Sequence, residues 1–113
     1  MTRYLISFDD GAITFPAEEL PDVAKAAHAV VREAMDAGVW VFGGGLTDHE
    51  EASLVGTDGT VTDNPYPDSR ERLGGFSVVD VPSRDEALKW AAKIAVACRC
   101  SQELRHFQYD PAS

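Results

Sequence analysis

The order of the predicted elements indicates an α+β fold. Two segments show the apolar periodicity of amphipathic helices, and they alternate with short runs of branched and aromatic residues that favour strands. Along the chain the elements are strand, helix, strand, hairpin, strand, helix, strand. Without the hairpin this order is βαββαβ, the split βαβ or ferredoxin-like pattern. A chain of 113 residues holds one hydrophobic core, so residues 1–113 are expected to form a single domain.

The first half of the pattern begins with a strand from Arg3 to Phe8, which the turn-forming Asp9-Asp10-Gly11 ends. The first helix starts at Pro21, a residue suited to a first turn, and Gly38 ends it as a left-handed cap. One face of this helix is apolar at helical spacing, with Val23, Ala26, Ala27, Val30, Val31, Ala34 and Met35.

The second strand, Val39 to Phe42, is apolar throughout and is therefore expected to be buried. It runs into Gly43-Gly44-Gly45, where we expect a bulge or a close approach of the backbone. The hairpin is predicted from Asp58-Gly59, which lies between the β-prone runs 52–55 and 60–62.

The second half continues with a strand from Phe76 to Val81, which Pro82 stops. Ser83 and Glu86 have the spacing of a capping box, so the second helix begins there. Its buried stripe is expected to contain Ala87, Leu88, Ala91, Ile94 and Ala95, with Trp90 at the margin. Glu103 to Tyr109 alternates polar and apolar residues and is predicted as the last strand.

The composition excludes several classes of partner. The formal net charge of −9 argues against nucleic acid and anionic membranes, because both require a basic face. The longest apolar run is far shorter than the ~20 residues of a membrane span. No secretory signal opens the chain. We therefore expect a cytoplasmic protein without a membrane or nucleic-acid partner.

The two cysteines, Cys98 and Cys100, are expected to be reduced thiols, because a disulfide across so small a ring is strained. A metal site would need two further ligands, and no Cys-x-x-Cys pair or paired-histidine spacing supplies them. The sequence thus predicts neither a metal nor a cofactor.

Two helices can cover only one face of the predicted sheet. The other face needs a cover too, and a second copy of the chain is the simplest one. We expect a homodimer packed sheet to sheet.

The stretch from Asp63 to Phe76 combines turn formers, charges and glycines directly before a buried strand, which is typical of a site-bearing loop. It resembles the signature of the YCII-related family, DGPF branch, which reads Asp-Gly-Pro-Phe, Ala-Glu-Thr-Lys-Glu, then a residue and Leu-Gly-Gly-Phe. The register matches without a gap, with Asn64 for glycine, which keeps the tolerance for left-handed backbone, and Tyr66 for phenylalanine. The similarity extends to residues 85–91 and 103–105.

The resemblance implies a ferredoxin-like α/β fold that is usually dimeric, as a dimeric α/β-barrel-like assembly. The biochemical role of the family is largely unknown. A helix histidine and a motif aspartate suggested that its members are enzymes, and by position these are similar to His28 and Asp63. Some DGPF-branch domains are joined to, or encoded beside, sigma-factor-like proteins, which implies an accessory role in transcription control as an alternative.

Two classes of function remain open. In the first, the chain is a small cofactor-independent enzyme that transfers a proton on a small organic substrate, with His28 and Asp63 as the acid–base pair. A carboxylate or other small anion would be held by Arg70 or Arg105. In the second, the domain binds a ligand or a protein and catalyses nothing.

The expected site is one concavity per subunit, lined by the loop of the signature, the glycine strand and the first helix. Tyr66 and Gly44 complete the predicted substrate-binding residues, since Gly44 belongs to the run that leaves space for a ligand. His49 follows the glycine strand and could approach the same loop, while His106 ends the last strand. Whether the three histidines converge on one site is left open by the sequence.

Overall fold

The computed structural model describes residues 1–65 and 72–112. Its elements are β1 (Thr2–Asp9), η1 (Asp10–Ala12), η2 (Ala17–Glu19), α1 (Leu20–Asp36), β2 (Trp40–Gly45), η3 (His49–Glu51), β3 (Ser53–Val55), β4 (Val61–Asp63), β5 (Leu73–Val81), α2 (Arg84–Cys98) and β6 (Glu103–His106).

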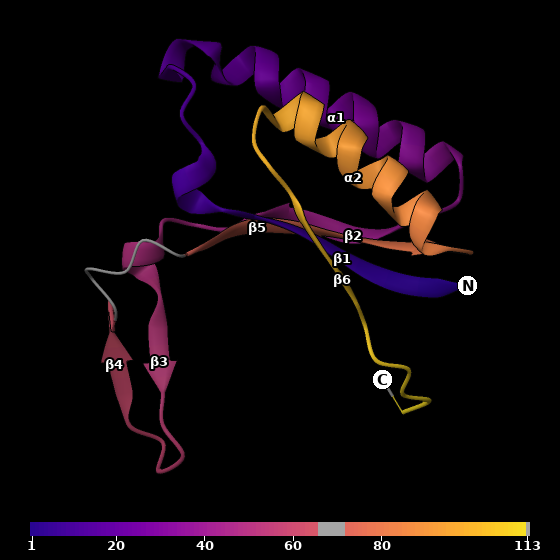
Figure 1. The fold of residues 1–113 in the computed structure, drawn as a ribbon. Helices are drawn as coiled ribbons and strands as arrows, with labels where there is room; N and C mark the ends of the chain where they lie inside the picture. Colours follow the sequence, from indigo (N-terminus) through magenta and orange to yellow (C-terminus); the bar gives the residue numbers. More distant parts are fainter. Residues whose placement is uncertain (66–71, 113) are drawn as a thin grey trace.

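Four strands form an antiparallel sheet in the order β2-β5-β1-β6, and both helices lie over the same face of it (Figure 1). This order is that of the split βαβ pattern, so the predicted α+β class and its extra hairpin are confirmed. The hairpin, β3 paired with β4, is a separate two-stranded sheet that extends away from the helices (Figure 1). The last strand ends at His106 rather than Tyr109, because its ladder with β1 closes at the pair Tyr4 and His106.

The core lies between the two central strands and α2. Ile6 of β1 and Val79 and Val81 of β5 are fully buried. Side chains of α2 close over them, and the small ones permit a close approach of helix and sheet: Ala87, Trp90, Ala91 and Ile94. Trp90 is 5% exposed, so its predicted place at the stripe's margin is wrong; the ring is packed within the core cluster.

The ends of both helices follow the sequence. Gly38 has φ +74°, the left-handed conformation predicted for it after α1. Ser83 accepts a hydrogen bond from the Glu86 backbone N–H at 3.3 Å and caps α2. Neither α1 nor α2 is long and apolar enough to cross a membrane, which holds for every helix among the described residues.

The apolar stripe of α1 is only partly buried. Val23 and Ala34 are inside, whereas Met35 is 57% exposed and the middle of the stripe borders a cavity above the sheet. Ala34, near the carboxyl end of the helix, belongs to the core cluster on the sheet, whereas Val23 lines the cavity.

The glycine run of β2 contains one position that only glycine can fill. A Cβ at Gly43 would lie 2.6 Å from the Phe76 carbonyl oxygen and 2.8 Å from Ser77 Cα, both in the neighbouring strand. The ladder between β2 and β5 also shifts register between Trp40 and Phe42. The expected close approach of the backbone is thus found at Gly43.

We expect Gly43→Ala to lower the free energy of unfolding by about 1–3 kcal/mol, because the added methyl group meets backbone atoms that cannot move aside without disturbing the ladder. Gly44→Ala is the matched control, since a Cβ there has no atom within 4 Å. Urea denaturation of both variants measures the difference, and equal midpoints would contradict this account of Gly43.

Candidate functional site

A cavity of about 540 Å³ lies between α1, the glycine strand and the end of β1. Its volume is within the range of small-molecule pockets, and most of its wall is apolar. The lining includes residues from every neighbouring element: Phe8, Ile13, Phe15, Leu20, Val23, Ala24, Ala27, His28, Val30, Val31, Met35, Trp40, Gly43, Gly44, Gly45, Phe76, Ser77, Ile94, Cys98, Cys100 and Gln102.

The cavity lies between the glycines of β2 on one side and the apolar stripe of α1 on the other. The three glycines of β2 carry no side chains that could fill the space. His28 contributes the imidazole of the wall from α1. At the inner end Gln102 donates hydrogen bonds to the carbonyl oxygen and the Sγ atom of Cys100, each at 3.4 Å.

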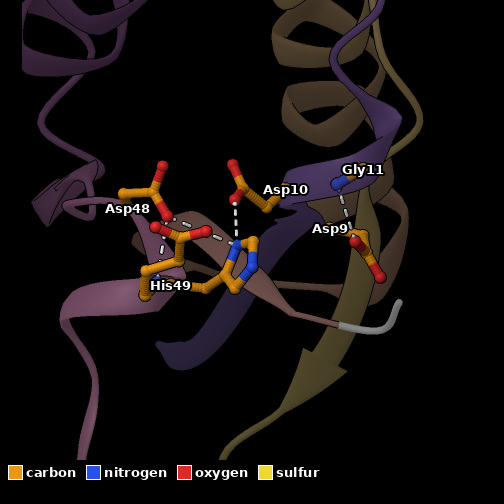
Figure 2. A network of polar contacts seen from close by, with 6 residues as sticks. Asp9, Asp10, Gly11, Asp48 and His49 are labelled. Carbon is orange, nitrogen blue, oxygen red and sulfur yellow. Dashed lines mark hydrogen bonds and ion pairs between the residues drawn. The ribbon is translucent and has the colours of Figure 1, made fainter. Parts of the chain in front are cut away.

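A histidine and an aspartate meet at the end of the sheet. His49 Nδ1 lies 3.0 Å from Asp10 Oδ2, and the two side chains face each other (Figure 2). Asp48 Oδ1 lies 3.6 Å from the same nitrogen. The side chains of His49 and Asp10 are 31% and 39% exposed, so water screens the pair only in part.

Two short turns position this pair in the same way. Asp9 accepts a hydrogen bond from the Gly11 N–H at 2.9 Å and caps η1, so that Asp10 is the first residue of that turn. Asp48 accepts one from the Glu50 N–H at 2.9 Å and caps η3, whose first residue is His49. Each member of the pair thus follows an aspartate that fixes its backbone.

An irregularity in the sheet aims Asp10 at the histidine. The ladder between β1 and β5 shifts register between Phe8 and Asp9, and the Asp10 N–H then donates to the Arg72 carbonyl oxygen at 2.6 Å. Such bulges turn a side chain out of the regular alternation and are common beside active sites.

Neither member of the pair is among the residues that line the cavity. Phe8, two residues before Asp10, and Gly45, four residues before His49, do line it. A carboxylate at Nδ1 favours the tautomer that carries its proton there, which leaves Nε2 free to accept one. The pair can therefore move a proton to or from a molecule that reaches Nε2.

Asp48, His49 and Glu50 bring their ligand atoms within 4.8 Å of one another, as a metal site would require. The hydrogen bond from the Glu50 N–H to Asp48 already explains this spacing as a capped turn, and both acids are exposed. The spacing alone does not indicate a cation.

The structure places the predicted acid–base residues apart. His28 lies in the cavity wall on α1. Asp63 lies at the end of β4, in the hairpin that extends away from the helices (Figure 1), and accepts a hydrogen bond from Ser53 Oγ at 2.7 Å. The adjacent Asn64 has φ +46°, the left-handed conformation that the sequence favours there. Asp63 therefore joins the two strands of the hairpin, and it is not among the residues that line the cavity.

The predicted substrate-binding residues are also dispersed. Gly44 belongs to the cavity wall, whereas Arg105 on β6 lines two hollows elsewhere on the surface. Tyr66 and Arg70 lie outside the described residues. The histidines occupy three places, since His106 stacks on the ring of Tyr4 with the centroids 5.2 Å apart, away from both His28 and His49.

Asp10 is the residue that sequence reasoning missed. It reads as part of a strand-ending turn, and the separation of 39 positions from His49 hides their contact. A signal did exist: both stand directly after an aspartate, Asp10 at the end of β1 and His49 four residues after β2.

Comparison with known proteins gives a family but no close relative. No curated protein matches the chain. Among solved structures it is similar to 5-chloro-2-hydroxyhydroquinone dehydrochlorinase from Burkholderia phenoliruptrix AC1100, in complex with 2,5-dihydroxybenzoquinone, with 15% identity over 97% of each chain and a TM-score of 0.48. A likeness of this degree carries no argument about activity. The model of the YCII-related domain, in contrast, matches residues 4–100, and the chain therefore belongs to the YCII-related family.

Proposed function

We propose that this protein is a small-molecule enzyme that moves a proton on a small organic substrate without a cofactor. The observation that carries the proposal is the His49–Asp10 pair at 3.0 Å, in a chain that also holds an apolar cavity of ligand size. An imidazole oriented by a carboxylate is a group that general acid–base catalysis uses.

In this reaction the substrate occupies the cavity and presents an acidic C–H to His49 Nε2. The C–H bond breaks, the proton moves to Nε2, and its electron pair remains on the substrate as an enolate. The carboxylate of Asp10 stabilises the imidazolium that forms. The proton, or one from water, then returns to a carbon of the substrate.

The wall favours a neutral, largely apolar substrate. Among the described residues that line the cavity there is no arginine or lysine, and Arg105 lies elsewhere. Arg105 is therefore not placed to hold a carboxylate there, and Arg70, the other arginine that the sequence suggested, lies outside the described residues. His28 is placed to hydrogen-bond an oxygen of a neutral substrate, such as a carbonyl group.

We also propose a homodimer. Leu5, Phe42 and Val78 share the sheet face that the helices leave uncovered, since Val78 pairs with both of the others and alternates with the buried Val79. Phe42 is 61% exposed and packs edge-to-face on Phe76. An uncovered apolar face of this kind is suited to a second copy of the chain. The accessory role in transcription stays a prediction on which no contact of the described residues bears.

Deuterium exchange into 2-tetralone, an apolar ring ketone with an acidic C–H, tests the reaction. We expect His49→Gln to slow enzyme-dependent exchange, followed by NMR in D₂O, by about 10²–10⁴-fold, because the base is removed. Asp10→Asn should slow it by about 10²-fold, because the tautomer and the imidazolium lose their support. His106→Gln is the matched control and should exchange at the wild-type rate. Wild-type exchange in His49→Gln would reject the proposal, and a loss in His28→Gln alone would return the role of base to His28.

The cysteines of the cavity are not expected to act as nucleophiles. Burial raises the pKa of the Cys98 thiol, and the neighbouring Cys100 raises it further. Burial also raises the pKa of Cys100, against the lowering effect of the hydrogen bond from Gln102. Both are therefore protonated at neutral pH.

We expect iodoacetamide to alkylate Cys98 and Cys100 in the folded protein more slowly than N-acetylcysteine at pH 7, since only the thiolate reacts. The rate should rise as the pH increases beyond the usual thiol pKa. Mass spectrometry of each cysteine follows the reaction, and faster labelling than the free thiol at pH 7 would show an activated nucleophile.

For the dimer, light scattering at micromolar concentration should give twice the mass of the chain. Phe42→Glu should give a monomer, because it places a charge in the proposed interface. Val96→Glu is the control, at an 80% exposed position of α2 on the helical side of the sheet. A wild-type monomer would remove the proposal.

A further inference from the structure

We infer that Gly45 determines which molecules the cavity admits, and that it makes room for a neutral ring compound. The inference rests on the proposed function for the identity of the reaction, but its structural basis is separate.

Gly45 has no conformational or packing reason to be glycine. Its φ is not positive, since the glycines with positive φ are Gly38 and Gly59. A Cβ at Gly45 would have no atom within 4 Å, in contrast to Gly43, where it would meet the backbone of β5. Glycine weakens a strand, by roughly 0.5–1 kcal/mol relative to alanine in an element interior. The absence of a side chain here is thus unexplained by the fold.

The sheet register shows where a side chain at Gly45 would extend. Gly45 pairs with Gly75, which in turn pairs with Phe8 of β1. Residues paired across an antiparallel ladder point to the same face. Phe8 and the fully buried Ile6 are two residues apart in β1 and point to the same face, the one that the helices cover. A side chain at Gly45 would therefore enter the space between sheet and helix. Gly44 pairs with Phe76 and belongs to the opposite face.

Gly45 lines the cavity together with Phe8 and Gly43. A bulky residue at position 45 would therefore take up part of the space in which a molecule binds.

The rest of the wall indicates the shape of that molecule. Phe8, Phe15 and Trp40 line the same cavity, and aromatic side chains pack well on flat rings. A volume of about 540 Å³ is within the range of small-molecule pockets and leaves room for one or more rings. The substrate class is thus a neutral mono- or bicyclic compound with a carbonyl group beside an acidic C–H.

Substitution with valine at Gly45 and, as a control, at Thr62 of the hairpin tests the inference. Gly45→Val should weaken the binding of 2-tetralone, measured by isothermal titration calorimetry, by about tenfold or more, because the side chain occupies the ligand's space. Its thermal midpoint should equal or exceed that of the wild type, since valine favours a strand. Thr62→Val lies on β4, outside the cavity lining, and should bind 2-tetralone as the wild type does. Gly45→Ala, which adds one methyl group, should give a smaller loss and is the variant to use if Gly45→Val does not fold.

Equal affinity of the wild type and both Gly45 variants would overturn the inference, and so would a wild type that does not bind 2-tetralone. If the wild type binds the ketone, Gly45→Val does not, and neither exchanges deuterium, the inference about Gly45 holds and the proposed proton transfer fails. Binding that survives in His49→Gln while exchange is lost supports both.

Discussion

The antiparallel pairing of β1 with β5 is the interaction on which the rest of the structure depends. These strands are central in the sheet, and their inner residues Ile6, Val79 and Val81 are fully buried under α2. Burial of side chains of this size stabilises a fold by about 1.5–3 kcal/mol each. The same ladder ends in a shift of register between Phe8 and Asp9, which directs Asp10 out of the sheet. The element that stabilises the core therefore also positions one half of the proposed catalytic pair.

The two helices cover different parts of that sheet. The alanine-rich face of α2 lies directly on the central strands, whereas α1 lies over β2, where Gly43 and Gly45 add no side chains to the face under the helices. The stripe of α1 consequently has fewer groups to pack against, and several of its residues line the cavity instead. Apolar surface that a close-packed core would have buried is thereby kept available to a ligand, and burial of a ligand would recover part of its hydrophobic free energy.

The sequence predicts those features that depend on local residues. The Ser83 cap and the left-handed Gly38 appear where expected, because each is determined within a few residues. The buried stripe of α2 differs from the prediction, since Leu88 is exposed and Trp90 is buried. The site could be predicted only in part. The cavity follows from the glycine strand and the first helix, but the contact of His49 with Asp10 joins residues 39 positions apart. It depends on a bulge that has no sequence signature of its own.

The placement of Asp63 shows why a signature residue is a weak guide to chemistry. Its carboxylate accepts the Ser53 hydroxyl across the β3–β4 pair, and a two-stranded hairpin of this kind is marginal alone, so such a cross-strand bond has structural value. The hairpin that carries Asp63 extends away from the helices (Figure 1), so its carboxylate is not beside the imidazole on α1. Asp10, by contrast, has its backbone fixed by the Asp9 cap and its carboxylate directed to His49. A carboxylate whose backbone is fixed and which contacts an imidazole is better placed to serve the chemistry than one engaged in the fold.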